Sequence, residues 1–162
     1  MPADASPISA DVVKATFLYK FVPFVEWPAS SPAGSGMPVV ICVVGVDPFG
    51  PALEQSLAAQ HLGDRPIVVR PMLLARPNSG CQVMYITGSD TQSIDQALKI
   101  VRGEPILTVT DEATSKGIVD FNVVQGRVRF RLDQQAAVDN GLRLRAPLLA
   151  LAVSVVPERG PK

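Results

Sequence analysis

The clearest pattern in the chain is an almost unbroken apolar run at residues 39–46. The run is rich in β-branched residues and flanked by turn formers, which is typical of a strand buried on both faces of a sheet. Asp47 is suited to cap a helix, and Pro48 is suited to the first helical position. We therefore predict a helix at residues 49–60, so that strand and helix form half of a βαβ unit.

The segment before this strand, at residues 9–24, has the spacing of a helix. Large apolar side chains recur every three or four positions, at Val13, Phe17, Phe21 and Phe24. Lys14 and Lys20 fall outside this stripe, and Pro23 is expected to kink or end the last turn. The pattern favours a helix packed on the sheet over a helix that presents its aromatic face to a partner.

Apolar runs predict further strands at residues 65–71, 83–87 and 106–109. The prolines that flank the first of these suit the edge of a sheet. Ser89 and Gln92 have the spacing of a capping box, which predicts a helix at residues 90–102.

The pattern then changes to strict alternation of apolar and polar residues at positions 119–123 and 127–132. With the turn-forming pair at positions 125–126 between them, these segments predict an antiparallel hairpin with one wet face. Asp133 can cap a short helix that ends at Gly141. Pro147 then introduces a last apolar helix, expected at residues 148–155.

Together these elements predict the α/β class, with a mixed, mostly parallel sheet, helices on both faces and an antiparallel C-terminal hairpin. A length of 162 residues suits one domain. We expect a flexible N-terminal segment at residues 1–11, a single α/β domain at residues 12–156 and a flexible tail at residues 157–162.

Composition and charge exclude several classes of protein. Hydrophobic residues make up 47% of the chain and charged residues 19%, which argues against disorder. Fifteen basic residues balance fifteen acidic ones, so charge gives no reason to expect nucleic acid or an anionic membrane as a partner. The apolar run at residues 146–156 is too short to span a bilayer. The N-terminus has no signal-peptide pattern; this fits a cytosolic protein and equally an exported one whose signal peptide is missing from the sequence.

No catalytic pattern stands out, and we predict a non-enzyme without cofactor or metal. Gly45 and Gly50 have the outer spacing of a phosphate loop, but Pro51 and Ala52 stand where that loop needs Lys and Ser or Thr. The single histidine, His61, lies in a predicted turn and has no cysteine near it in sequence.

Three acidic residues follow predicted strands: Asp47, Asp90 and Asp111. At one rim of a parallel sheet their carboxylates could hold Mg²⁺ or a small ligand, so a ligand-sensing or metal-sensing domain is the alternative function. Capping of the following helices is the favoured interpretation of these acids. The cysteines, Cys42 and Cys81, are either two buried thiols or one disulfide between neighbouring strands.

Arginines form the main charge cluster of the chain, at positions 127, 129, 131, 143 and 145. An exposed strand face whose charges discourage edge-to-edge pairing is the favoured interpretation. A site for an acidic partner is the alternative.

Several motifs in order resemble those of the YfiR-like proteins. The N-terminal signature is present as FLYKF at residues 17–21 and FVEWP at residues 24–28. Further matching segments are ICVVG at 41–45, DPFG at 47–50, residues 63–69, residues 81–86, LTVTD at 107–111, residues 118–130 and residues 133–149. The resemblance runs from about residue 12 to residue 152.

The resemblance implies a small periplasmic protein with an α/β sandwich fold. The best-known type binds the periplasmic part of an inner-membrane diguanylate cyclase and represses it, and an outer-membrane lipoprotein can sequester it, which releases cyclic-di-GMP synthesis and biofilm formation. The resemblance also implies export to the periplasm, and it favours a Cys42–Cys81 disulfide. A second cysteine pair of some members, in the region matching residues 116–123, is missing from this chain. A homodimer is compatible with this reading.

If the protein is a repressor, we expect its partner to bind near the closing segment of the motif, at residues 133–149. The expected interface is an exposed apolar surface around Leu142, Leu144 and Leu148, with Arg143 and Arg145 at its rim.

Overall fold

The computed structural model describes residues 10–28, 37–46, 53, 55, 57, 60–112 and 114–158. Its elements, in chain order, are α1 (Ala10–Lys20), η2 (Val22–Phe24), β1 (Val25–Glu26), β2 (Val39–Val44), β3 (His61–Leu62), β4 (Arg65–Met72), β5 (Val83–Ile86), α3 (Ile94–Val101), β6 (Leu107–Asp111), β7 (Val119–Val124), β8 (Arg127–Asp133), α4 (Gln134–Asp139), β9 (Arg143–Leu144), α5 (Ala146–Leu151) and β10 (Ser154–Val156).

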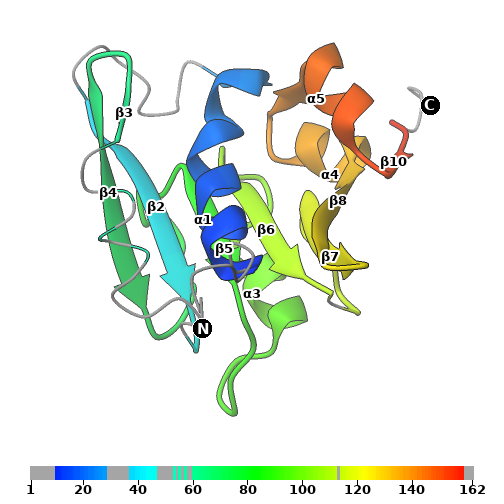
Figure 1. The fold of residues 1–162 in the computed structure, drawn as a ribbon. Helices are drawn as coiled ribbons and strands as arrows, with labels where there is room; N and C mark the ends of the chain where they lie inside the picture. The colour runs from blue at the N-terminus through cyan, green and yellow to red at the C-terminus, as the bar shows by residue number, and fades with distance from the viewer. Residues whose placement is uncertain are drawn as a thin grey trace, which may run out of the picture.

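The strands of the described residues form a large sheet and a small one. The large sheet has the order β10-β8-β7-β6-β5-β2-β4-β3, and β1 pairs with β9 in the small sheet. From β4 to β7 the neighbours are parallel, whereas β7 and β8 form an antiparallel hairpin. The predicted α/β class, with a mostly parallel sheet and an antiparallel hairpin, is therefore confirmed (Figure 1).

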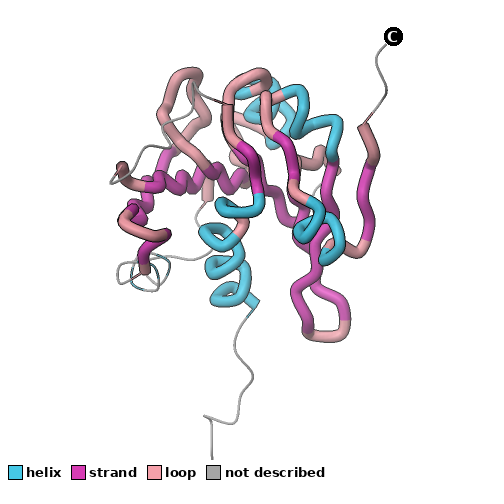
Figure 2. The backbone as a smooth tube through the Cα atoms, turned by 90° about the horizontal axis from the view of Figure 1, so that it is seen from above, coloured by secondary structure: helices cyan, strands magenta, loops and turns pink. Residues whose placement is uncertain are grey.

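Helices lie on both sides of the strands, as the view from above in Figure 2 shows. The central strand β2 explains the two layers, because its side chains alternate between two cores. Ile41 and Val43 belong to the core under α1, whereas Cys42 and Val44 belong to a second core under α3. The predicted burial of this strand on both faces is thus correct.

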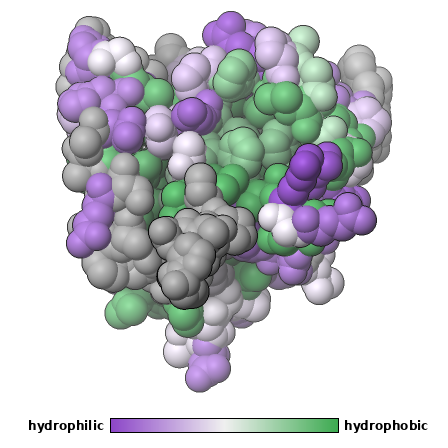
Figure 3. Space-filling model, in the orientation of Figure 1, coloured by the Kyte–Doolittle hydropathy of each residue, from purple (hydrophilic) through white to green (hydrophobic). Residues whose placement is uncertain are grey.

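The core under α1 is rich in aromatic side chains. Phe21 stacks on Phe17 with ring centroids 5.5 Å apart, and it meets the edge of Phe130 at 5.2 Å. Phe121 lies 6.0 Å from Phe21 on the sheet side. Figure 3 shows that apolar residues also gather on the surface of this side of the molecule. The predicted helix on the sheet is confirmed, and the helix ends at Lys20 before the short turn η2 that contains Pro23.

The helix α3 begins later than predicted. Its N-cap is Ser93, and Gln96 completes the capping box. The predicted box at Ser89 and Gln92 is wrong because Gln92 is engaged elsewhere. The carboxamide of Gln92 is buried and bonds both backbone groups of Ala75, at 2.8 Å to its N–H and 3.4 Å to its carbonyl.

The predicted hairpin and the helix after it are present. Gln125 and Gly126 turn the chain with φ values of 52° and 78°, the left-handed conformation that a two-residue hairpin loop requires. Asp133 caps α4 by accepting a hydrogen bond from the N–H of Ala136 at 3.0 Å.

The end of the chain differs from its prediction as one apolar helix at residues 148–155. The helix α5 ends at Leu151, and Ser154–Val156 form β10, which pairs parallel with β8. The valine-rich end suits a strand better than a helix, because β-branched side chains fit a pleated sheet.

The predicted helix at residues 49–60 lies largely outside the described residues. Leu53, Gln55 and Leu57 are helical, and the two leucines are buried in the core under α1. No helix among the described segments is long and apolar enough to cross a membrane.

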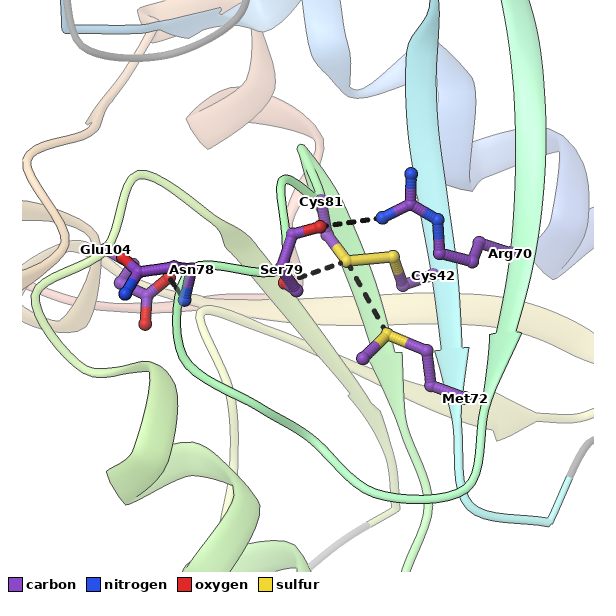
Figure 4. The surroundings of a disulfide bond; sticks show 7 residues. All are labelled: Cys42, Arg70, Met72, Asn78, Ser79, Cys81 and Glu104. Atoms are coloured by element: carbon purple, nitrogen blue, oxygen red, sulfur yellow. Dashed lines mark hydrogen bonds between the residues drawn. A yellow bond between two sulfur atoms is a disulfide. The ribbon is translucent and has the colours of Figure 1, made fainter.

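A disulfide joins Cys42 in β2 to Cys81 just before β5, with the Cα atoms 5.9 Å apart (Figure 4). This confirms the disulfide that the resemblance favoured. The hydroxyl of Ser79 lies 3.1 Å from the Cys81 sulfur, and the Met72 sulfur lies 3.9 Å from it. Both cysteines are fully buried, so the bond is part of the core under α3.

Candidate interaction groove beside the small sheet

A shallow hollow of about 400 Å³ opens between the small sheet and the β3–β4 turn. We call this hollow the groove. It is lined by Val22, Pro23, Val25, Trp27, Leu62, Gly63, Arg65 and Arg145. Its walls are mostly apolar, and two arginines stand at its margins.

The first wall forms where the chain leaves α1 through the short turn η2 and then becomes extended. Pro23 suits the short turn η2 but not a continued helix. The chain then runs as β1, and Val25 pairs with Leu144 of β9. The N–H of Arg145 donates to the carbonyl of Phe24 at 2.9 Å, which fixes Arg145 beside η2.

Trp27 is the largest side chain of the groove and is only partly buried. Its indole N–H donates to the carbonyl of Val22 at 3.1 Å, so the ring is held in place by η2. An aromatic ring that is partly exposed and already ordered loses little entropy when a partner covers it, which is a property of binding hot spots.

The opposite margin carries Arg65, which is fixed by carbonyl oxygens. Its guanidinium donates to the carbonyl of Met37 at 2.9 Å and to the side-chain oxygen of Gln82 at 2.7 Å. Burial lowers the pKa of the Arg65 guanidinium, and the neighbouring Asp64 opposes that change. The group remains a cation at neutral pH, because an arginine pKa starts far above that range.

This arrangement suits the binding of another protein. An apolar floor can receive a side chain of a partner, and the two arginines can pair with carboxylates at the rim. Within the described ranges, no group of three or more His, Cys, Asp or Glu side chains lies close enough to hold a metal ion.

The structure corrects part of the predicted interface. Leu142, Leu144 and Leu148 are core residues with 2%, 6% and 1% exposure, so the expectation that they form an exposed surface is wrong. Arg143 and Arg145 are exposed, as expected of a rim.

The burial of these leucines has a local cause. Gly141 adopts a φ of 76° after α4, and the N–H of Leu142 donates to the carbonyl of Ala137 at 2.8 Å. This helix end turns the chain back onto the core. The following Leu-Arg alternation then places Leu144 inward and both arginines outward.

The acidic rim is not assembled as a single site by the described residues. Asp47 lies outside them. Asp90 is exposed beside the N-terminus of α3, where it lines an open hollow with Ser89 and Ser93. Asp111 instead faces α1, on the other side of the sheet.

Asp111 is engaged by two side chains. Its Oδ2 atom accepts hydrogen bonds from the Lys14 ammonium and from the hydroxyl of Tyr85, the latter at 2.8 Å. Lys14 was expected outside the buried stripe of α1, but it is 7% exposed. The ion pair explains its burial, because a charge inside a protein needs an opposite charge and hydrogen bonds. It joins α1 to the end of β6.

We expect the Lys14→Ala substitution to lower the free energy of unfolding by about 1–3 kcal/mol, because it leaves the partly buried Asp111 carboxylate without its cation. The combined Lys14→Met and Asp111→Asn variant should recover most of this loss, since it removes both charges at similar volume. Urea unfolding of the three proteins measures the effect. A double variant less stable than Lys14→Ala would show that the ion pair is not the cause.

Sequence reasoning missed most of the groove. Trp27 was noticed only as part of a motif, and Pro23 only as a helix breaker. The sequence signal is the tryptophan in the short segment between Pro23 and Pro28, because the two prolines keep this segment out of the preceding helix. Leu62 and Arg65 carried no signal, since only the fold brings them beside Trp27.

Comparison with known proteins agrees with this architecture. The model of the YfiR/HmsC-like family matches residues 11–153, which is nearly the whole chain. No curated protein matches the sequence. The match includes α1, the disulfide strands, the hairpin and both walls of the groove. The chain belongs to the YfiR/HmsC-like family.

Proposed function

We propose that this protein is a periplasmic, non-enzymatic regulator that binds the periplasmic part of an inner-membrane diguanylate cyclase and holds the enzyme inactive. The family match over residues 11–153 carries the proposal. Regulation of this kind controls cyclic-di-GMP and, through it, biofilm formation.

The Cys42–Cys81 bond supports the periplasmic part of the proposal. Disulfides form and persist in the bacterial periplasm and are rare in the cytosol. The bond lies in the core, where it stabilises the fold.

The groove is the proposed contact surface for the cyclase. It combines an ordered, partly exposed tryptophan with apolar walls and two arginines at its margins. An aromatic anchor surrounded by a charged rim is typical of the interface regions that contribute most to binding energy. The exposed Arg145 at the margin replaces the buried leucines of the sequence-based expectation.

The test compares variants for binding to the purified periplasmic domain of a diguanylate cyclase from the same genome. We expect Trp27→Ala to weaken the affinity by about tenfold or more, the loss typical of an interface hot spot. Leu73→Ala is the matched control, because Leu73 is an exposed apolar side chain away from the groove. This control should bind like the original protein in isothermal titration calorimetry.

A second variant, at an exposed side chain, distinguishes a lost contact from an effect of Trp27→Ala on folding. Arg145→Glu changes an exposed side chain of the groove and should also weaken binding, whereas Arg76→Glu makes the same charge change elsewhere and should not. Equal affinity of both groove variants and their controls would move the contact surface away from the groove. Absence of binding to the cyclase domain in the original protein would overturn the proposed function itself.

Two further parts of the hypothesis stay predictions: sequestration by an outer-membrane lipoprotein and formation of a homodimer.

A further inference from the structure

The strand β8 presents three arginines on one face. Arg127, Arg129 and Arg131 are all exposed, while Phe130 and Leu132, at the alternate positions, are buried under α1. Successive side chains of a strand point to opposite sides, so the three arginines lie on the side of the sheet away from α1. We call them the arginine face.

No helix of the described chain packs on the arginine face. The helix α3, on the same side of the sheet, covers a core that includes side chains of β2 and β5 and Ile106, just before β6. In Figure 1 the hairpin β7–β8 lies to the right of α3. The face is therefore open to a partner.

The charge of this face is largely uncompensated. The side chains of Arg127 and Arg129 make no hydrogen bond or ion pair with any residue that the structure describes, and Arg131 donates only to the hydroxyl of Ser154, at 3.0 Å. The nearby acids have other partners. Asp120 accepts from the Thr110 hydroxyl at 2.6 Å, and Glu112 accepts from the N–H of Val123 at 3.1 Å.

A neighbouring side-chain amide also lacks a hydrogen-bond partner for its oxygen. Asn122 lies opposite Arg129 in the hairpin register. Its side-chain oxygen is shielded from solvent and has no donor. Arg129 therefore does not turn toward the one acceptor directly across from it, and its guanidinium remains free for an external group.

The spacing of the arginines indicates the shape of that group. Alternate residues of a strand recur about every 6.8 Å, and the same repeat separates alternate side chains of any other extended chain. Carboxylates at every second residue of an extended segment would therefore face the arginines one to one. Arginine binds a carboxylate through two parallel hydrogen bonds, which rewards this match in position.

We propose that the arginine face is a docking site for an extended acidic segment of a protein partner, with carboxylates at alternate positions. The net charge of the chain is zero, so the attraction for anions is local to this face. The chain as a whole is not attracted to an anionic membrane. The site is distinct from the groove, which lies by α1 and η2, and it does not depend on the cyclase proposal.

Two synthetic peptides test the proposal with the full chain. One alternates Glu and Thr over eight residues, and the other has the same composition with four Glu followed by four Thr. We expect the alternating peptide to bind about fivefold more tightly in fluorescence anisotropy, the equivalent of one exposed ion pair. The Arg127→Gln and Arg129→Gln double variant should abolish this preference. The matched control is Arg76→Gln with Arg102→Gln, two exposed arginines elsewhere, and should keep it.

Vesicles of phosphatidylglycerol and phosphatidylethanolamine form a further arm of the experiment. Equal affinity for the two peptides, or a preference unchanged in the double variant, would overturn the proposal. Vesicle binding that is lost in the double variant, without any peptide preference, would identify a membrane contact and overturn it too. The groove is intact in these variants, so the substitutions should leave cyclase binding through Trp27 unchanged.

Discussion

Replacing Phe21 with alanine is expected to lower the free energy of unfolding by about 3–5 kcal/mol, the usual cost of truncating a buried aromatic side chain. Phe21 is 2% exposed and touches the rings of Phe17, Phe121 and Phe130. Its removal leaves a cavity where α1 meets β7 and β8. The loss should therefore loosen the helix from the hairpin half of the sheet.

Urea unfolding followed by circular dichroism measures this effect. Lys20→Ala is the control, because Lys20 is the exposed last residue of α1, directly before Phe21. Its effect should stay within about 0.5 kcal/mol, as for most surface substitutions. A loss below 1 kcal/mol for Phe21→Ala would contradict the packing of α1 described above.

Removing the disulfide with Cys42→Ala and Cys81→Ala should lower the free energy of unfolding by about 3–4 kcal/mol. The bond closes a chain segment with a sequence separation of 39, and a cross-link of that length restricts the unfolded chain by about this amount. Alanine is the replacement of choice, because a serine hydroxyl at these buried positions would add a second cost.

The measurement is urea unfolding of the double variant and of the original protein, each with and without reductant. Reductant should destabilise the original protein and leave the variant unchanged, and this difference isolates the bond from the loss of the two sulfur atoms. Equal stability of oxidised and reduced original protein would contradict a stabilising Cys42–Cys81 disulfide.

Patterns that involve only neighbouring residues predicted the structure well. The β2 strand, the β7–β8 hairpin and the Asp133 cap each depend on a few adjacent side chains. The mostly parallel α/β class followed from their order. The exact pairing of strands across the sheet did not follow, because it is set by contacts between distant segments.

The errors arose where two local signals compete. Ser89 with Gln92 and Ser93 with Gln96 have the same spacing, and only the bonds from Gln92 to Ala75 decide between them. The apolar run at the C-terminus suits a helix or a strand by hydrophobicity alone. The segment becomes the strand β10 because it can pair with the edge of β8.

The site was predictable only in part. The arginines at positions 143 and 145 were placed on the surface correctly, because charged residues that alternate with leucine face water. The leucines were misplaced, because the sequence does not show that Gly141 turns them toward the core. The Trp27 groove depends on β3 and β4, which are distant in sequence. Asp111, the partner of Lys14, is separated from it by 97 positions.

Repression requires more than binding, because the protein must also lower the activity of the cyclase. The most direct measurement is the rate of cyclic-di-GMP formation from GTP by the full-length cyclase in sealed liposomes. This protein is added on the side of the cyclase's periplasmic domain. We predict saturable inhibition by the original protein and weaker inhibition by Trp27→Ala at the same concentration. An unchanged rate at concentrations that saturate binding would contradict the account.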